Sequence, residues 1–113
     1  MKNERMTYEA FKSKYVIFED NHRGYDFLIQ KPFETHYCGY VKIPKNHKYH
    51  DKDYDKIDIK IHGDLSFGEY IEEDWWIGWD YNHDLPGEKD LVLIDIIKDC
   101  CSVIMQLEIE SHN

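Results

Sequence analysis

The stretch Leu91–Ile109, LVLIDIIKDCCSVIMQLEI, is one long apolar-rich segment near the C-terminus. Apolar side chains recur in it at spacings of three and four residues, which is the spacing of one face of an α-helix. This stripe consists of Leu93, Ile97, Cys100, Ile104 and Leu107. Its β-branched residues would also suit a strand, but the length of the segment favours a helix. The sequence therefore predicts a C-terminal helix that buries one face.

The segments before this helix show the two-residue alternation and the turn signals of β-strands. Ile57, Ile59 and Ile61 alternate with polar residues and form the clearest half-buried strand. In the tryptophan-rich strand at 75–80, alternation places Trp75 and Trp79 in the core and Trp76 on the opposite face. Further strands are predicted at 15–18, 25–29 and 36–43.

Two other segments complete the expected architecture. Thr7–Lys12 is predicted to form a short helix with Thr7 as its N-cap. The polar segment 45–55 is predicted to be a loop, and the connection around Gly68 allows the strands at 57–61 and 75–80 to be hairpin neighbours. The predicted fold class is α+β, with one domain spanning residues 1–113. It is an antiparallel sheet of about four to six strands packed against a C-terminal α-helix, with a short N-terminal helix.

Composition limits the possible functions. A chain of 113 residues with 42% hydrophobic and 15% aromatic residues is suited to a single folded domain rather than to a disordered chain. Its 23 acidic residues outnumber 14 Lys and Arg, which gives a formal charge of −9. That balance argues against direct binding of a nucleic-acid backbone, which requires a cationic face. A protein partner with a basic surface is the better electrostatic match.

Cysteine usage and the N-terminus bear on location. Cys100 and Cys101 are neighbours that would point about 100° apart on a helix, so they are poorly placed for a disulfide. Buried thiols of this kind are typical of a reducing compartment. The N-terminus lacks a signal peptide, and no window approaches the roughly 20 apolar residues of a membrane span. We therefore expect a soluble protein of the cytoplasm with no membrane partner.

The histidines are the first candidate functional residues. Of the seven in the chain, His62 ends the predicted isoleucine strand and His83 follows the tryptophan strand, three residues after Asp80. His47 lies in the lysine-rich loop and can supply a third nitrogen. Neutral imidazoles with a carboxylate are good ligands for zinc. The alternative is a set of ordinary surface histidines, since no CxxC, HxxxH or HExxH motif is present.

An acidic stretch beside the tryptophans is the second candidate. Glu69, Glu72, Glu73 and Asp74 are either solvated surface or a group of carboxylates that imitates phosphates for a basic groove. Trp76, on the opposite face of its strand, would then be an aromatic anchor for a partner. Catalytic signatures are absent from the sequence: it contains no phosphate loop, dinucleotide fingerprint or nucleophile elbow.

Four ordered motifs between Cys38 and His83 resemble a family of small phage and prophage proteins. The family's motifs read CGYV-x-(V/I)P-x-x-H, HGGLTF and WWFGFD-x-x-H, and they are followed by a C-terminal helix. The matching segments here are Cys38–Val41, Ile43–His47, Ile61–Phe67 and Trp75–His83. Asp64 departs from the pattern, because the family usually has glycine there. Tyr81 and Asn82 replace smaller residues, and the first 37 residues carry no family motif.

The resemblance implies a site and a function. Its His/Asp pattern falls on His47, His62, Asp80 and His83, which implies a zinc site. Four protein ligands would make such a site closed and structural rather than catalytic. The phage context implies a type II anti-CRISPR protein, which would inhibit the RNA-guided DNA nuclease of a host type II CRISPR system in the bacterial cytoplasm without being an enzyme. The alternative is a small metal-dependent hydrolase that acts on a nucleotide or phosphate substrate, which would require an open coordination position.

Overall fold

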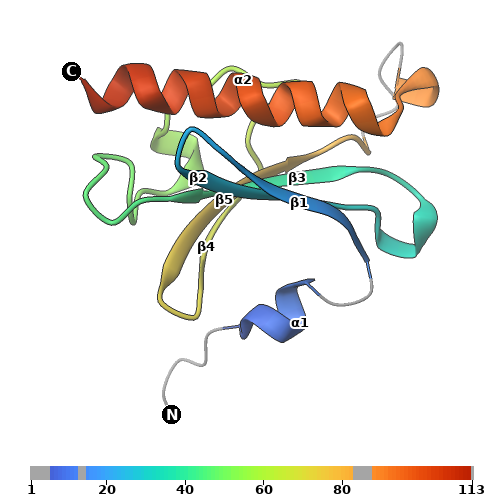
Figure 1. Cartoon of the computed structure of the whole chain (residues 1–113), viewed down its shortest axis with the longest axis horizontal. Helices are drawn as coiled ribbons and strands as arrows, with labels where there is room; N and C mark the ends of the chain where they lie inside the picture. Colours follow the sequence, from blue (N-terminus) through green and yellow to red (C-terminus); the bar gives the residue numbers. More distant parts are fainter. Residues whose placement is uncertain (1–5, 13–14, 83–87, 113) are drawn as a thin grey trace.

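Five antiparallel strands form a single sheet in the order β1-β2-β3-β5-β4, with a helix on each face (Figure 1). The structure is a computed structural model and describes residues 6–12, 15–82 and 88–112. The strands are β1 (Val16–His22), β2 (Tyr25–Gln30), β3 (Cys38–Ile43), β4 (Phe67–Ile71) and β5 (Asp74–Asp80). The helices are α1 (Tyr8–Lys12) and α2 (Leu93–Ser111), with short 3-10 turns η1 (Pro32–Glu34), η2 (Tyr54–Lys56) and η3 (Glu88–Asp90). The α+β prediction is confirmed.

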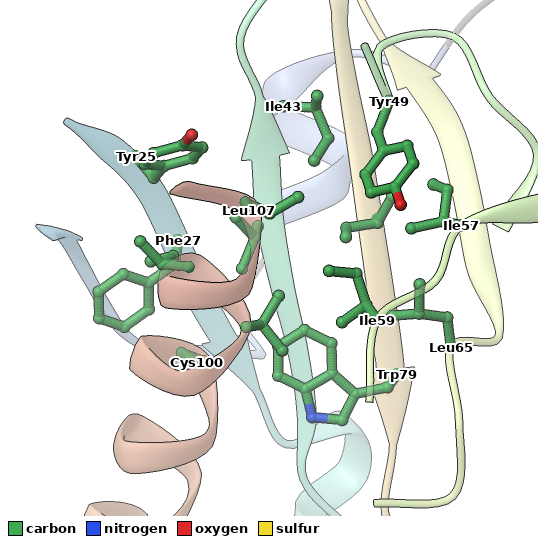
Figure 2. Close-up of a cluster of buried hydrophobic side chains, with 14 of the residues drawn as sticks. Tyr25, Phe27, Ile43, Tyr49, Ile57, Ile59, Leu65, Trp79, Cys100 and Leu107 are labelled. Atoms are coloured by element: carbon green, nitrogen blue, oxygen red, sulfur yellow. The ribbon is translucent and has the colours of Figure 1, made fainter. Parts of the chain in front are cut away.

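Helix α2 lies across one face of the sheet and closes the main hydrophobic core (Figures 1 and 2). The helix begins and ends two residues later than predicted, and the Asp95 carboxylate accepts a hydrogen bond from the Val92 backbone N–H at 2.9 Å. Its buried residues are Ile96, Cys100, Val103, Ile104 and Leu107. Leu93 and Ile97 are only partly buried, so the buried face is rotated slightly from the predicted stripe.

The opposite face of the sheet carries a second, smaller core under α1. Trp76 is 3% exposed and is buried there with Phe11, Leu28 and Ile71. The Phe11 ring centroid lies 5.3 Å from that of Trp76. Trp76 lies on the face that alternation predicts, but the expectation that it is accessible to a partner is wrong, because α1 covers it.

Helix α1 is held to the sheet by polar contacts. Its predicted N-cap is confirmed, since the Thr7 hydroxyl oxygen accepts a hydrogen bond from the Ala10 backbone N–H at 3.1 Å. The Glu72 carboxylate accepts a hydrogen bond from the Tyr8 backbone N–H at 2.9 Å, and the Tyr8 hydroxyl donates to Asp74. A helix of five residues has little stability on its own, so these contacts and the aromatic packing keep it in place.

The strand prediction at residues 57–61 is wrong, although its pattern of burial is correct. Ile57 and Ile59 are 8% and 7% exposed and face the core (Figure 2), but they lie in an irregular extended segment. The Gln106 side chain of α2 replaces a neighbouring strand there: it accepts a hydrogen bond from the Lys60 N–H at 2.7 Å and donates to the Lys60 carbonyl at 2.8 Å. The edge strand next to β5 is instead β4, which was expected to be part of a connection.

Two reciprocal glycine–aromatic pairs join β3 to β5. Gly39 lies opposite Trp79, and in the adjacent pair Tyr40 lies opposite Gly78. A Cβ atom on Gly39 would lie 2.5 Å from the Trp79 ring, and one on Gly78 would lie 2.5 Å from the Tyr40 ring. Each aromatic ring therefore occupies the space left by the glycine on the facing strand, which is a known device for stabilising glycine in a sheet.

Gly39→Ala should consequently destabilise the protein by about 2–3 kcal/mol, because the added methyl group has to displace the Trp79 ring. Urea denaturation followed by tryptophan fluorescence measures the effect. Gly68→Ala is the matched control and should cost less, because its new Cβ would lie 3.3 Å from the Tyr54 backbone nitrogen, compared with 2.5 Å from the Trp79 ring for Gly39→Ala. Equal losses for the two variants would contradict the role assigned to the Gly39–Trp79 pair.

Candidate functional site

His47 is buried, and both of its ring nitrogens are engaged. Its Nε2 donates a hydrogen bond to the Leu107 carbonyl at 2.8 Å, and its Nδ1 accepts one from the Tyr49 backbone N–H at 3.0 Å. A carbonyl oxygen can only accept, so the proton lies on Nε2. His47 therefore ties the segment after β3 to the C-terminal half of α2, and coordinating a metal would require breaking one of these bonds.

His62 lies near the beginning of α2, in a different group of side chains. Its Nε2 is 2.7 Å from a carboxylate oxygen of Glu88, whose side chain is only 7% exposed. Its ring stacks on Tyr81, with centroids 5.3 Å apart and an interplanar angle of 17°. The His62–Glu88 pair joins the segment after residue 61 to the turn that precedes α2.

Tyr81 links this pair to the core. Its hydroxyl accepts a hydrogen bond from the Trp79 indole at 2.9 Å and donates one to the Asp99 carboxylate at 2.5 Å. Burial, and then the hydrogen bond to Asp99, raise the pKa of Tyr81 well above its usual value of 10.0. The hydroxyl is therefore a neutral structural link between β5 and α2.

Asp80 makes a separate set of contacts at the end of β5. Its carboxylate accepts hydrogen bonds from the Ser66 hydroxyl at 3.2 Å and from the Asn82 backbone N–H at 3.1 Å. Burial, and to a smaller extent the neighbouring Asp80 carboxylate, raises the pKa of the Cys38 thiol to about 11. Cys38 is thus a protonated, buried thiol. Of the two cysteines that were predicted to be buried, Cys100 is buried and Cys101 is only partly buried.

The described residues do not assemble the predicted four-ligand zinc site. His47 contacts Leu107 in the C-terminal half of α2, whereas His62 contacts Glu88 in the turn before the helix begins. His83 lies outside the described residues. Within residues 6–12, 15–82 and 88–112, no group of three or more His, Cys, Asp and Glu side chains is placed to share a metal ion. Zinc binding itself stays a prediction.

The four predicted acidic contact residues belong to one hairpin but have two different roles. Glu72 and Asp74 are engaged with Tyr8, so they position α1. Glu69 is exposed on β4, and the Glu73 side chain is 87% exposed, with Lys45 at 4.0 Å. Only Glu69 and Glu73 are therefore available to a partner without disturbing the fold.

Further carboxylates surround α1 on the same face of the sheet. Glu19 pairs with Lys12 at 3.0 Å, and Asp26 pairs with Lys42 at 3.0 Å. A hydrogen bond from Asn21, followed by the contact with Lys42, lowers the pKa of Asp26. Beside these pairs is a surface cavity of about 370 Å³. It is lined by Tyr8, Lys12, Glu19, Asp20, Asp26, Phe27, Leu28 and Trp76.

Comparison of this chain with protein-family models, with curated proteins and with solved structures found no match. The part of the chain that the structure describes contains no helix with both the length and the apolar character of a membrane span.

Several contacts in this region could not be predicted from the sequence. The roles of Glu88 and Asp99 had no local signal, because their partners His62 and Tyr81 are 26 and 18 residues away. The burial of Trp76 did have a signal. Large apolar residues of both parities in Trp75–Trp79 are typical of a strand covered on both faces.

His47→Ala should lower the free energy of unfolding by about 2–4 kcal/mol, because it leaves buried backbone groups unpaired and opens a cavity. Chemical denaturation with and without a chelator measures this, and we expect the same loss in both conditions. His112→Ala, at an exposed position, is the control. A loss confined to metal-loaded protein would show that His47 is a metal ligand instead.

Tyr81→Phe should flatten the loss of stability at alkaline pH. In the unfolded chain Tyr81 ionises near pH 10, whereas the raised pKa keeps it neutral in the folded protein, so its contribution to stability is lost as the pH rises above 10. Each such group contributes a slope of up to about 1.4 kcal/mol per pH unit. Denaturation at several values between pH 7 and pH 11.5 tests this. Identical pH slopes for the variant and the original protein would contradict it.

Proposed function

We propose that the protein is a binding protein, not an enzyme, and that it docks an acidic surface on a cationic surface of another protein. This acidic surface, which we call the α1 face, consists of α1 and the exposed residues Glu69 and Glu73 of the neighbouring hairpin. The observation that carries this proposal is the position of the exposed carboxylates of Glu69 and Glu73. Both belong to the β4–β5 hairpin, whose turn lies away from α2 and on the same side as α1 (Figure 1). Exposed carboxylates on a well-supported hairpin are suited to entering a basic groove.

The hairpin is held in shape before any partner arrives. Its two-residue turn has Ile71 paired with Asp74, and Glu72 has a positive φ of 57°. The contacts of Glu72 and Asp74 with Tyr8 attach the turn to α1, and Trp76 is buried underneath. A rigid surface loses less conformational entropy on binding than a mobile one, so more of its interaction energy appears as affinity.

The formal charge of −9 adds long-range attraction to a cationic partner. An RNA-guided DNA nuclease is a partner of this kind, because it holds its heteroduplex in a positively charged channel. A small acidic protein in that channel would exclude DNA without chemistry. With the resemblance to phage and prophage proteins, this supports an anti-CRISPR role in the bacterial cytoplasm.

Reversing the charge of these two exposed carboxylates tests the surface directly. The double variant Glu69→Lys, Glu73→Lys should slow association with a guide-loaded type II nuclease about tenfold at low salt, and it should weaken the dependence on salt. Stopped-flow or surface-plasmon measurements at several salt concentrations give both quantities. DNA cleavage by the nuclease should be less inhibited in the same proportion.

The matched control is the double variant Asp53→Lys, Asp58→Lys, which changes the net charge equally on the segment between β3 and β4. Both residues are exposed, and the Asp58 side chain is 82% exposed. This control should retain fast association. If both double variants slow association equally, net charge alone explains the effect, and the α1 face is not the contact surface.

A further inference from the structure

Helix α1 is attached to the sheet by side chains at both of its ends. At its start, the Glu72 carboxylate accepts a hydrogen bond from the Tyr8 backbone N–H at 2.9 Å, and the Tyr8 hydroxyl donates to Asp74. At its other end, the buried Gln30 side chain donates to the Phe11 carbonyl. Carbonyls in the last turn of a helix have no partner within the helix, so Gln30 satisfies one of them.

Apolar packing contributes one large side chain to this attachment. Phe11 is the buried residue of α1, whereas Tyr8 is only partly buried. The Phe11 ring centroid lies 4.9 Å from that of Tyr40 and 5.3 Å from that of Trp76. A helix of five residues does not form by itself, so these few contacts have to offset the whole conformational entropy of the ordered segment.

The space beneath α1 is incompletely filled. The surface cavity of about 370 Å³ lies between Tyr8 and Lys12 of the helix and Leu28 and Trp76 of the sheet. The Trp76 indole N–H is buried and finds no hydrogen-bond acceptor among the described residues. A buried donor without an acceptor costs free energy that contact with water would recover. Both features make the position of α1 less favourable than that of a fully packed helix.

The main core does not depend on α1. Trp75, Ile77 and Trp79 belong to the cluster that α2 covers, and Phe11 belongs to the separate cluster on the other face of the sheet. Release of α1 would therefore expose the smaller cluster and leave the larger one intact. A segment with few buried apolar contacts and its own polar attachments is typical of a unit that unfolds locally.

We propose that α1 is a cover that opens as a unit while the sheet and α2 stay folded, and that docking of the cationic partner holds it closed. The second part rests on the proposed function. Opening separates α1 from Glu69 and Glu73, so the open state no longer presents the α1 face. A partner that binds the closed state better than the open state lowers the open fraction by the ratio of the two affinities.

Hydrogen exchange of single amides, followed by NMR on the full chain, tests the opening. The backbone N–H groups of Tyr8, Phe11 and Glu72 are bonded to the Glu72 carboxylate, the Thr7 carbonyl and the Met6 carbonyl, so release of α1 frees all three. We expect one common opening constant for them, about 100-fold larger than that of the amides that pair β3 with β5. Their exchange should depend only weakly on urea, because opening exposes little surface.

Tyr8→Phe removes the hydrogen bond to Asp74 and keeps the aromatic ring. It should raise the opening constant of α1 about tenfold and leave the amides between β3 and β5 unchanged. Tyr54→Phe is the matched control, because Tyr54 is an exposed tyrosine in η2, between β3 and β4. It should leave the opening constant of α1 unchanged.

Two results would overturn the opening. The first is exchange of the α1 amides with the same opening constant and the same urea dependence as the β3–β5 amides, since α1 would then open only when the whole protein unfolds. The second is equal acceleration of both sets of amides by Tyr8→Phe, since the bond to Asp74 would then stabilise the entire fold.

Exchange in the presence of excess guide-loaded type II nuclease, followed by mass spectrometry, tests the effect of docking. The peptide that contains α1 should exchange about tenfold more slowly in the complex. If the nuclease binds and this exchange is not slowed, docking does not hold α1 closed, although the proposed function stands. If the nuclease does not bind the chain, the proposed function and the effect of docking are both wrong, whereas the free chain still decides whether α1 opens.

Discussion

Burial of β5 on both faces is the constraint on which the other elements depend. Trp75, Ile77 and Trp79 point into the core under α2, while Trp76 points to the opposite side. A sheet with large apolar side chains on both faces requires a cover on each, because exposed tryptophan surface is costly in water. The long helix α2 covers one face, and the short helix α1 covers part of the other.

Because α1 has to be held on the second face of the sheet, the acidic β4–β5 hairpin has a structural role in addition to its charge. Helix α1 is too short to be stable alone, so Glu72 and Asp74 hold it through Tyr8, and its rings pack on Trp76. The four carboxylates that are equivalent in the sequence therefore divide into two that support the fold and two, Glu69 and Glu73, that are exposed to solvent. The aromatic residue expected to meet a partner instead supports the surface from below.

Polar side chains of the segments before α2 also serve its packing. His47 binds the Leu107 carbonyl, and His62 with Tyr81 connects to Glu88 and Asp99. Gln106 supplies both hydrogen bonds that a strand partner would have given to Lys60. These links hold both the N-terminal and the C-terminal half of α2 to the rest of the protein.

Local patterns in the sequence determined the α+β class, the C-terminal helix, the Thr7 cap and most strands, because periodicity and capping depend on neighbours along the chain. They also identified Ile57 and Ile59 as core residues. Only the tertiary structure decided that their segment pairs with a glutamine side chain while Phe67–Ile71 forms the strand. It also decided that His47 binds a backbone carbonyl 60 residues away and that α1 buries Trp76. Such pairings depend on distances between remote segments, for which one sequence carries no local signal.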